Sequence, residues 1–164
     1  MNFIDTHTHL FLNQFKDDID DVIDIAIRSG ITKMFLPNIN SETTDSMLQL
    51  CEKYPGNCFS MMGLHPCDVK KETMEKELLH VEEMLEKEKF IAVGEIGLDL
   101  YWDKTTLEIQ KMAFEFQIKL AKKHKLPIVI HVRDSFLEAI EIVEKLNDKN
   151  LSGVFHCFTG NVDD

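Results

Sequence analysis

The feature that most constrains the fold is a regular alternation of short apolar, β-prone runs with segments of helical periodicity. Six runs predict strands, over residues 3–6, 31–37, 58–66, 90–95, 126–131 and 152–157. Apolar residues recur at helical spacing in the five intervening segments, within 17–30 and 41–56 and over 72–89, 105–124 and 136–146. Strands that alternate with helices are typical of βα units and a parallel sheet.

Local signals predict where several of these helices begin, end and face the core. Gly30 is placed to end the first helix, Ser41 is expected to cap the second, and the Pro55-Gly56 pair to stop it. The third helix is highly charged, so its buried side should be the apolar residues Leu78, Val81 and Leu85.

Composition places the chain among compact, unexported proteins. It has 164 residues, a net charge of −11 and 44% hydrophobic residues, which fits one domain with a real core. The sequence has no 18-residue apolar stretch and begins without a signal-peptide pattern, so we expect a cytoplasmic protein with no membrane partner. The cysteines agree with that compartment, because no C-x-x-C pair occurs and Cys51, Cys58, Cys67 and Cys157 are expected to be reduced thiols.

The acidic balance argues against a broad basic surface that grips a nucleic-acid backbone. A phosphate substrate would therefore need a local source of positive charge, and bound metal ions would provide one. Cys157 beside His156 could instead be a nucleophile or a ligand, but a structural thiol is the favoured interpretation.

The distribution of polar residues distinguishes two parallel-sheet architectures. An open doubly wound sheet binds ligands at one topological switch point, whereas a (β/α)₈ barrel places catalytic groups after many strands. Here candidate groups follow the first, third, fourth, fifth and sixth strands. This favours an α/β barrel of the TIM type. A full barrel has eight strands and about 250 residues, so residues 1–164 are expected to form about six βα units, the N-terminal portion of one barrel domain whose C-terminal strands are missing.

The polar residues after the strands include suitable metal ligands. His7 and His9 are two residues apart, so they project from the same face of an extended chain. The others are His65, Glu95 with Asp99, His131 with Arg133, and His156. Imidazole and carboxylate groups bind zinc, manganese and similar ions, and a carboxylate can bridge two cations about 3.5–4 Å apart. Each residue also has a structural explanation: Glu95 could cap a turn, His131 could be a hydrogen-bonded histidine, and His156 could pack beneath a loop.

The segments DTHTHL, GLHP, VGEIGLD, IHVRD and HCFTG resemble the motifs of the TatD family of metal-dependent deoxyribonucleases, in the amidohydrolase superfamily of (β/α)₈ barrels. The resemblance implies two divalent ions (zinc, magnesium or manganese), with His7 and His9 on one, His131 and His156 on the other, and Glu95 as the catalytic bridge. It also implies a DNA substrate. The family has a late aspartate in a Thr-Asp-Ala-Pro setting that neither Asp163 nor Asp164 matches, so this form is expected to be catalytically weak.

Three further residues have roles that the sequence leaves open. By resemblance, His65 lies on the substrate side and would contact phosphate or transfer a proton. Arg133 has a donor fork suited to phosphate, but an ion pair with Asp134 is an equal alternative. Asp99 could orient a metal ligand, or the segment from Gly97 to Asp99 could simply form a turn.

Two other functions remain open at this point. Related amidohydrolase barrels use similar ligands to hydrolyse amides, esters or lactones. The chain could also be a truncated, inactive metal-binding fragment, and exposed sheet edges in such a fragment would favour self-association.

Overall fold

The computed structural model describes residues 2–158, in which strands and helices alternate along the chain. The strands are β1 (Phe3–Asp5), β2 (Ile31–Pro37), β3 (Cys58–Met61), β4 (Val93–Asp99), β5 (Ile128–Arg133) and β6 (Gly153–Phe155). The α-helices are α1 (Ile19–Arg28), α2 (Ser41–Lys53), α3 (Met74–Lys87), α4 (Leu107–His124) and α5 (Phe136–Leu146), with short 3₁₀ turns η1 (Asn13–Phe15), η2 (Pro66–Asp68) and η3 (Lys104–Thr106). Asp163 and Asp164 lie outside the described residues.

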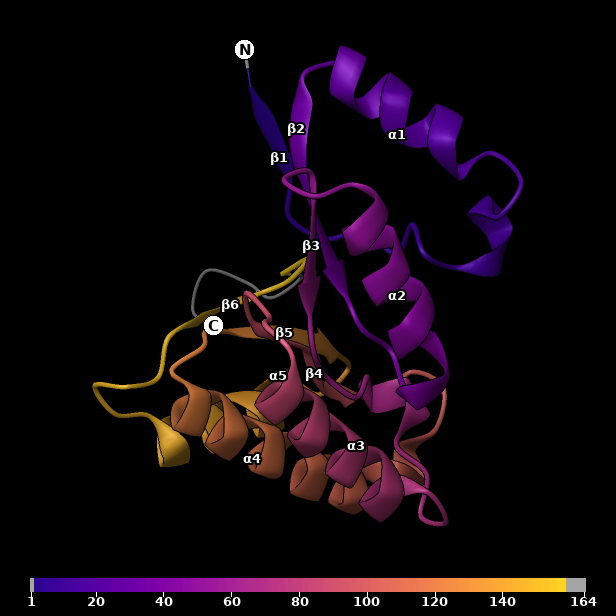
Figure 1. The fold of residues 1–164 in the computed structure, drawn as a ribbon. Helices are drawn as coiled ribbons and strands as arrows, with labels where there is room; N and C mark the ends of the chain where they lie inside the picture. Colours follow the sequence, from indigo (N-terminus) through magenta and orange to yellow (C-terminus); the bar gives the residue numbers. More distant parts are fainter. Residues whose placement is uncertain (1, 159–164) are drawn as a thin grey trace.

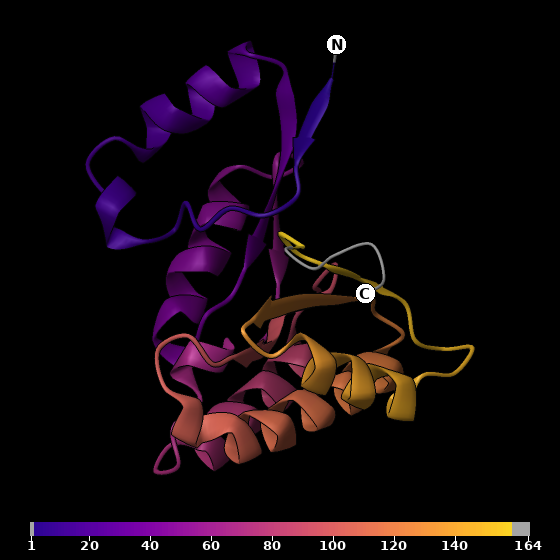
Figure 2. The ribbon, with the colours of Figure 1, turned by 180° about the vertical axis from the view of Figure 1, so that it is seen from behind.

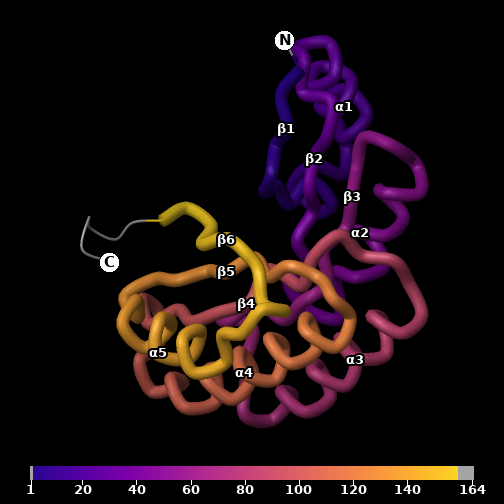
Figure 3. Tube along the Cα trace, turned by 90° about the vertical axis from the view of Figure 1, so that its left-hand side faces the viewer, coloured from indigo at the N-terminus to yellow at the C-terminus, as the bar shows by residue number. Residues whose placement is uncertain are grey.

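The six strands pair in parallel and in sequence order, as β1-β2-β3 and β4-β5-β6. A single parallel bridge between Met62 and Val93 joins the two sheets. Helices α1 and α2 lie beside the first sheet, and α3, α4 and α5 lie in a row against the second (Figure 1). The reverse view shows the helices following one another along the same outer side (Figure 2), and the tube trace shows β4, β5 and β6 above the row (Figure 3). Parallel strands on the inside and helices on the outside agree with the predicted architecture.

The helices agree closely with the periodicity of the sequence. Helix α5 has the predicted bounds, and α3 buries the three predicted residues Leu78, Val81 and Leu85. Helix α1 ends at Arg28, and Gly30 follows with a φ of 94°, a backbone conformation that glycine adopts without strain.

One predicted cap is wrong. The N-cap of α2 is Asn40, whose backbone is extended and whose side chain accepts a hydrogen bond from the Glu42 amide at 3.1 Å. The Thr43 hydroxyl in turn accepts a hydrogen bond from the Asn40 amide at 3.2 Å, which completes a capping box. Ser41 is instead the first helical residue, and its amide and hydroxyl both donate to the Glu77 carboxylate of α3. Asparagine is as good an N-cap residue as serine, because its side-chain oxygen accepts hydrogen bonds from the free amides of the first helical turn.

Two predicted strands differ from the structure by more than two residues at an end, and β1, β5 and β6 differ by one or two. Strand β3 ends at Met61 rather than at residue 66, because the chain turns away after the Met62 bridge and enters the η2 turn. Strand β4 runs from Val93 to Asp99 and not from 90 to 95, and all seven of its residues are buried. Strands buried on both faces are typical of parallel sheets. The turn considered for the segment from Gly97 to Asp99 is therefore wrong, and Glu95 lies inside a strand.

Other expectations concern the membrane, the thiols and the sheet edges. Among the described residues, no helix combines the length and apolar character that a membrane crossing needs. All four cysteines are free thiols. Within residues 2–158, β1 and β6 each pair on one side only, with Ile4 and Val154 exposed, so self-association through these edges stays a prediction.

Candidate metal centre

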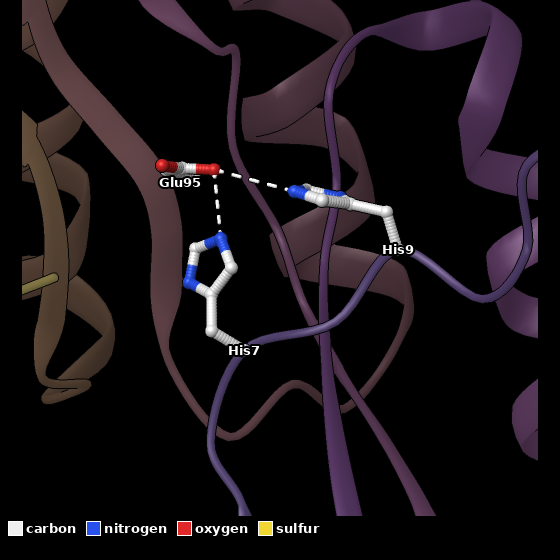
Figure 4. Close-up of side chains that lie close together, drawn as sticks. All are labelled: His7, His9 and Glu95. Atoms are coloured by element: carbon white, nitrogen blue, oxygen red, sulfur yellow. Dashed lines mark hydrogen bonds and ion pairs between the residues drawn. The ribbon is translucent and has the colours of Figure 1, made fainter. Parts of the chain in front are cut away.

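His7 and His9 are carried into the centre by the segment that continues β1. The Thr8 amide donates to the Phe35 carbonyl of β2 at 3.0 Å, so this segment stays beside β2 after β1 ends. Both rings point their Nε2 atoms toward Glu95. Their Nε2 atoms lie 3.0 Å and 3.5 Å from Oε2 of Glu95 (Figure 4). The Nδ1 atoms of both rings are buried and have no hydrogen-bond partner within the described part of the chain.

Glu95 is the residue on which the imidazoles converge. It lies in the middle of β4 with only 2% of its surface exposed. Its Oε1 lies 2.8 Å from Nδ1 of His131, on the neighbouring strand β5, and its Oε2 lies 3.6 Å from Nε2 of His65. Residues that are far apart in the sequence therefore surround one buried carboxylate.

Two sets of side chains have the spacing of a metal site. The first is His7, His9 and Glu95, and the second is His65, Glu95 and His131; within each set the ligand atoms lie within 4.8 Å of one another. Imidazole and carboxylate are donors that Zn²⁺ and Mn²⁺ accept. Because Glu95 belongs to both sets, its two oxygens could serve two neighbouring ions.

The hydrogen-bonding capacity of His131 tests whether the centre fits a cation. Its Nδ1 lies 2.8 Å from Glu95 and its Nε2 lies 2.8 Å from Asp99. A neutral imidazole has only one N–H, so one of these two contacts with a carboxylate lacks a hydrogen unless positive charge is added. A proton on the ring or a metal ion beside it would supply that charge. The residues present therefore fit a cation.

The pKa values follow from burial and from these contacts. Burial raises the pKa of Glu95, but hydrogen bonds from the surrounding imidazoles, first from His131, outweigh burial and hold the pKa well below its usual range. Burial lowers the pKa of His131, but hydrogen bonds to Glu95 and Asp99 raise it above its usual value. The result is an ionised carboxylate that attracts positive charge.

His65 differs from the other imidazoles. Its Nδ1 accepts the Cys67 amide at 3.1 Å, so the proton of the neutral ring is on Nε2, the atom that faces Glu95. Burial lowers the pKa of His65 to about 4, which keeps the ring neutral near pH 7. In this form Nε2 is a hydrogen-bond donor and offers no lone pair to a metal.

His156 lies in the turn that follows β6, and its amide donates to the Ile130 carbonyl at 2.8 Å. Its ring stacks on His7, with ring centroids 3.4 Å apart and planes 11° apart. It belongs to neither of the two sets of closely spaced ligand atoms. The structure thus brings His156 to the centre, and its role as a ligand stays a prediction.

Asp99 and Arg133 occupy the edge of the centre. Asp99 is the last residue of β4, and its carboxylate accepts the Tyr101 amide at 3.0 Å as well as contacting His131. Asp99 is therefore placed to fix the orientation of the His131 ring. Arg133 makes no ion pair with Asp134, although both residues are described; its guanidinium carbon lies 3.5 Å from the centroid of the Tyr101 ring.

Sequence reasoning missed two residues of this region. Tyr101 contacts both Asp99 and Arg133, and the Cys67 amide donates to Nδ1 of His65. Burial, followed by the charge of Asp99, raises the pKa of the Cys67 thiol to about 12, so this thiol stays protonated. The only sequence signal was proximity, since each residue lies two positions from a candidate, His65 or Asp99.

The model of one protein family, TatD related DNase, matches residues 4–164. The chain belongs to this family. It is 35% identical to "Uncharacterized metal-dependent hydrolase YabD" of Bacillus subtilis, over 97% of this chain and 62% of the relative. It is 30% identical to "3'-5' ssDNA/RNA exonuclease TatD" of Dickeya dadantii, over 98% of this chain and 60% of the relative.

A solved TatD homologue, YjjV from Escherichia coli, has a similar fold. Its crystal structure matches with a TM-score of 0.90 and 32% identity, over 98% of this chain and 62% of that chain. The described βα units are thus a partial barrel of the TatD type, as predicted. The chain spans about 60% of the length of these TatD relatives.

Proposed function

We propose that this chain is a metal-dependent hydrolase that cleaves phosphodiester bonds of DNA with two divalent ions. The observation that carries the proposal is the position of Glu95, a buried carboxylate whose two oxygens face different imidazoles, with His131 on one side and His7 and His9 on the other. This is the arrangement expected of a carboxylate that bridges two ions.

In this proposal His7, His9 and Glu95 hold one ion, and Glu95, His131 and His156 hold the other. The ions, when bound, would lower the pKa of water and neutralise the negative charge of the phosphate. They would also provide positive charge at the site of a chain whose net charge is −11. With an ion bound, Asp99 would accept a hydrogen bond from Nε2–H of His131, which leaves Nδ1 of that ring with a lone pair for the ion.

His65 acts on the substrate side. Its Nε2–H is directed toward the space beside Glu95 and can donate a hydrogen bond to a phosphate oxygen. The low pKa of the ring means that it donates as a neutral group and adds no charge. Arg133 reaches the same region from the end of β5 and offers a planar donor fork for phosphate.

The names of the relatives support a nucleic-acid substrate. The Dickeya dadantii relative is named for exonuclease activity on single-stranded DNA and RNA, and the Bacillus subtilis relative for metal-dependent hydrolysis. The alternative is hydrolysis of an amide, ester or lactone, and substrate assays would distinguish it from DNA cleavage.

The test compares the chelator-treated chain with the same chain after addition of Mg²⁺, Mn²⁺ or Zn²⁺, on end-labelled single-stranded DNA. We expect cleavage only with metal, and we expect Glu95→Gln to lower the rate about 100-fold or more, since it weakens both ion positions. Glu75→Gln, an exposed change on α3, is the matched control.

Cleavage that resists chelators, or a normal rate in Glu95→Gln, would contradict the mechanism. Hydrolysis of lactones or amides without cleavage of DNA would favour the alternative substrate class. Metal binding that depends on Glu95 without any hydrolysis would indicate an inactive metal-binding chain.

A further inference from the structure

We propose that Tyr101, Trp102 and Arg133 form a stacking platform for an unpaired nucleobase of the substrate beside the metal centre. The proposal rests on the proposed function, and it assigns a binding role to three side chains outside the ligand set. It makes an unpaired base next to the scissile phosphate a determinant of affinity.

The platform is attached to the centre at defined points. The Tyr101 amide donates to Oδ1 of Asp99, and Oδ2 of the same carboxylate contacts His131. The Leu100 amide donates to the Arg133 carbonyl at 2.9 Å, which holds the loop after β4 against the end of β5. A base on these rings would therefore lie next to the phosphate held at the centre.

The three side chains offer the chemistry that stacks on a base. The Arg133 guanidinium lies over Tyr101 at 3.5 Å, and the Tyr101 and Trp102 rings are perpendicular with centroids 4.8 Å apart. Aromatic rings and guanidinium planes both stack on nucleobases, whatever the base. The Tyr101 contact also fixes the otherwise flexible Arg133 side chain in one place.

Exposure of these rings is unusual for a purely structural role. Trp102 is 74% exposed and Tyr101 is 50% exposed, so neither ring is used mainly to fill the core. Large aromatic side chains are usually mostly buried, and exposed ones that lie together commonly mark a binding surface.

A cleft borders the platform at Arg133. It has a volume of about 400 Å³, within the range of small-ligand sites, and its lining includes His131, Arg133 and His156. Arg133 is the only lysine or arginine among its described lining residues. A base inside a duplex has both faces covered by its neighbours, so only an unpaired or frayed base could stack here.

Trp102 provides a direct readout, because it is the only tryptophan of the chain. The chain with Mg²⁺ is titrated with a cleavage-resistant phosphorothioate pentathymidylate and with a matched phosphorothioate oligonucleotide that carries abasic sites in place of the bases. We expect the base-bearing strand to quench Trp102 fluorescence and to bind about tenfold more tightly than the abasic strand.

Variants are compared by fluorescence polarisation of labelled forms of the same two oligonucleotides. Trp102→Ala and Tyr101→Ala should each lose about tenfold in affinity for the base-bearing strand and almost nothing for the abasic strand. Trp102→Phe should retain most of the affinity. Phe3→Ala is the control, because Phe3 is 51% exposed but lies at the start of β1, outside this cluster.

Equal affinity of the unmodified chain for both strands would overturn the proposal, and so would an equal loss for both strands in Trp102→Ala. The binding assay also separates this proposal from the proposed function. Base-dependent binding at Trp102 without metal-dependent cleavage would support the platform and contradict the nuclease proposal. Cleavage without any dependence on bases would contradict the platform alone.

Discussion

The Glu95 carboxylate and the His131 imidazole lie on neighbouring parallel strands, with Oε1 2.8 Å from Nδ1. The other oxygen of Glu95 faces His7 and His9, and the other nitrogen of His131 faces Asp99. Both oxygens of Glu95 thus face candidate ligand sets, whereas His131 has one nitrogen turned to the centre and the other held by Asp99. Such support is what keeps metal ligands in a fixed orientation.

Asp99→Asn tests whether this support matters for metal binding. The asparagine side chain is neutral, so it is a weaker hydrogen-bond acceptor for Nε2–H of His131 than the carboxylate, and Nδ1 becomes a poorer metal ligand. We expect affinity for Mn²⁺ or Zn²⁺ to fall by about 10- to 100-fold, as is usual for partners of metal ligands. Isothermal titration calorimetry measures the affinity, and Asp103→Asn, in an exposed loop, is the control. Equal affinities in the two variants would show that Asp99 has no such role.

His65→Ala and His156→Ala separate the two candidates for the third ligand of the second ion. Because Nε2 of His65 carries the ring proton, we expect its removal to leave metal affinity nearly unchanged while cleavage slows. His156, which already stacks on His7, should be needed for the affinity of the second ion. Metal titration followed by a cleavage assay measures both effects. A large loss of metal affinity in His65→Ala alone would assign the site to the set formed by His65, Glu95 and His131.

The lowered pKa of His65 predicts a pH effect on the metal-free chain. Because burial lowers its pKa from 6.5 to about 4, the unfolded state binds more protons between these values. Stability therefore falls as pH decreases from 6.5 toward 4, by up to about 3 kcal/mol from this group. His65→Gln should lose less stability than the unmodified chain between pH 7 and pH 4.5 in urea denaturation. His80→Gln, on α3, is the control, and an identical pH dependence in His65→Gln and the unmodified chain would contradict the argument.

Much of the fold could be predicted from the sequence, because local signals and tertiary packing agree in the helices. The apolar stripe of α3 and the bounds of α5 follow directly from helical periodicity. The predicted limits of β4 are wrong because Gly94, Glu95 and Gly97 are residues typical of a strand end. In the structure this segment is buried between neighbouring strands. A polar residue inside a buried strand is explained by its partners, which the local sequence does not identify.

The candidate site was predictable in part for a similar reason. The carboxyl-terminal parts of parallel strands meet on one side of the sheet, so the approach of His7, His9, His131 and His156 to one another could be predicted once the strands are found. The place of Glu95 inside β4 could not. The proton on Nε2 of His65 and the stacking of Arg133 on Tyr101 depend instead on backbone positions after the strands. Such contacts between loops have no periodic signal in the sequence.

Gly97→Ala tests how closely β4 must approach β5 for the centre to form. A Cβ at Gly97 would lie 2.0 Å from the carbonyl oxygen of His131, and the φ of 141° is one that other residues rarely adopt. The added methyl group must push apart the two strands that carry Glu95 and His131. We expect a loss of about 3 kcal/mol or more in the free energy of unfolding, together with weaker metal binding. Gly56→Ala is the matched control, because Gly56 also has a positive φ but open space around it, so about 1 kcal/mol should be lost and metal binding kept. Equal destabilisation of the two variants in urea, with metal affinity unchanged in both, would mean that close contact at Gly97 does not hold the centre together.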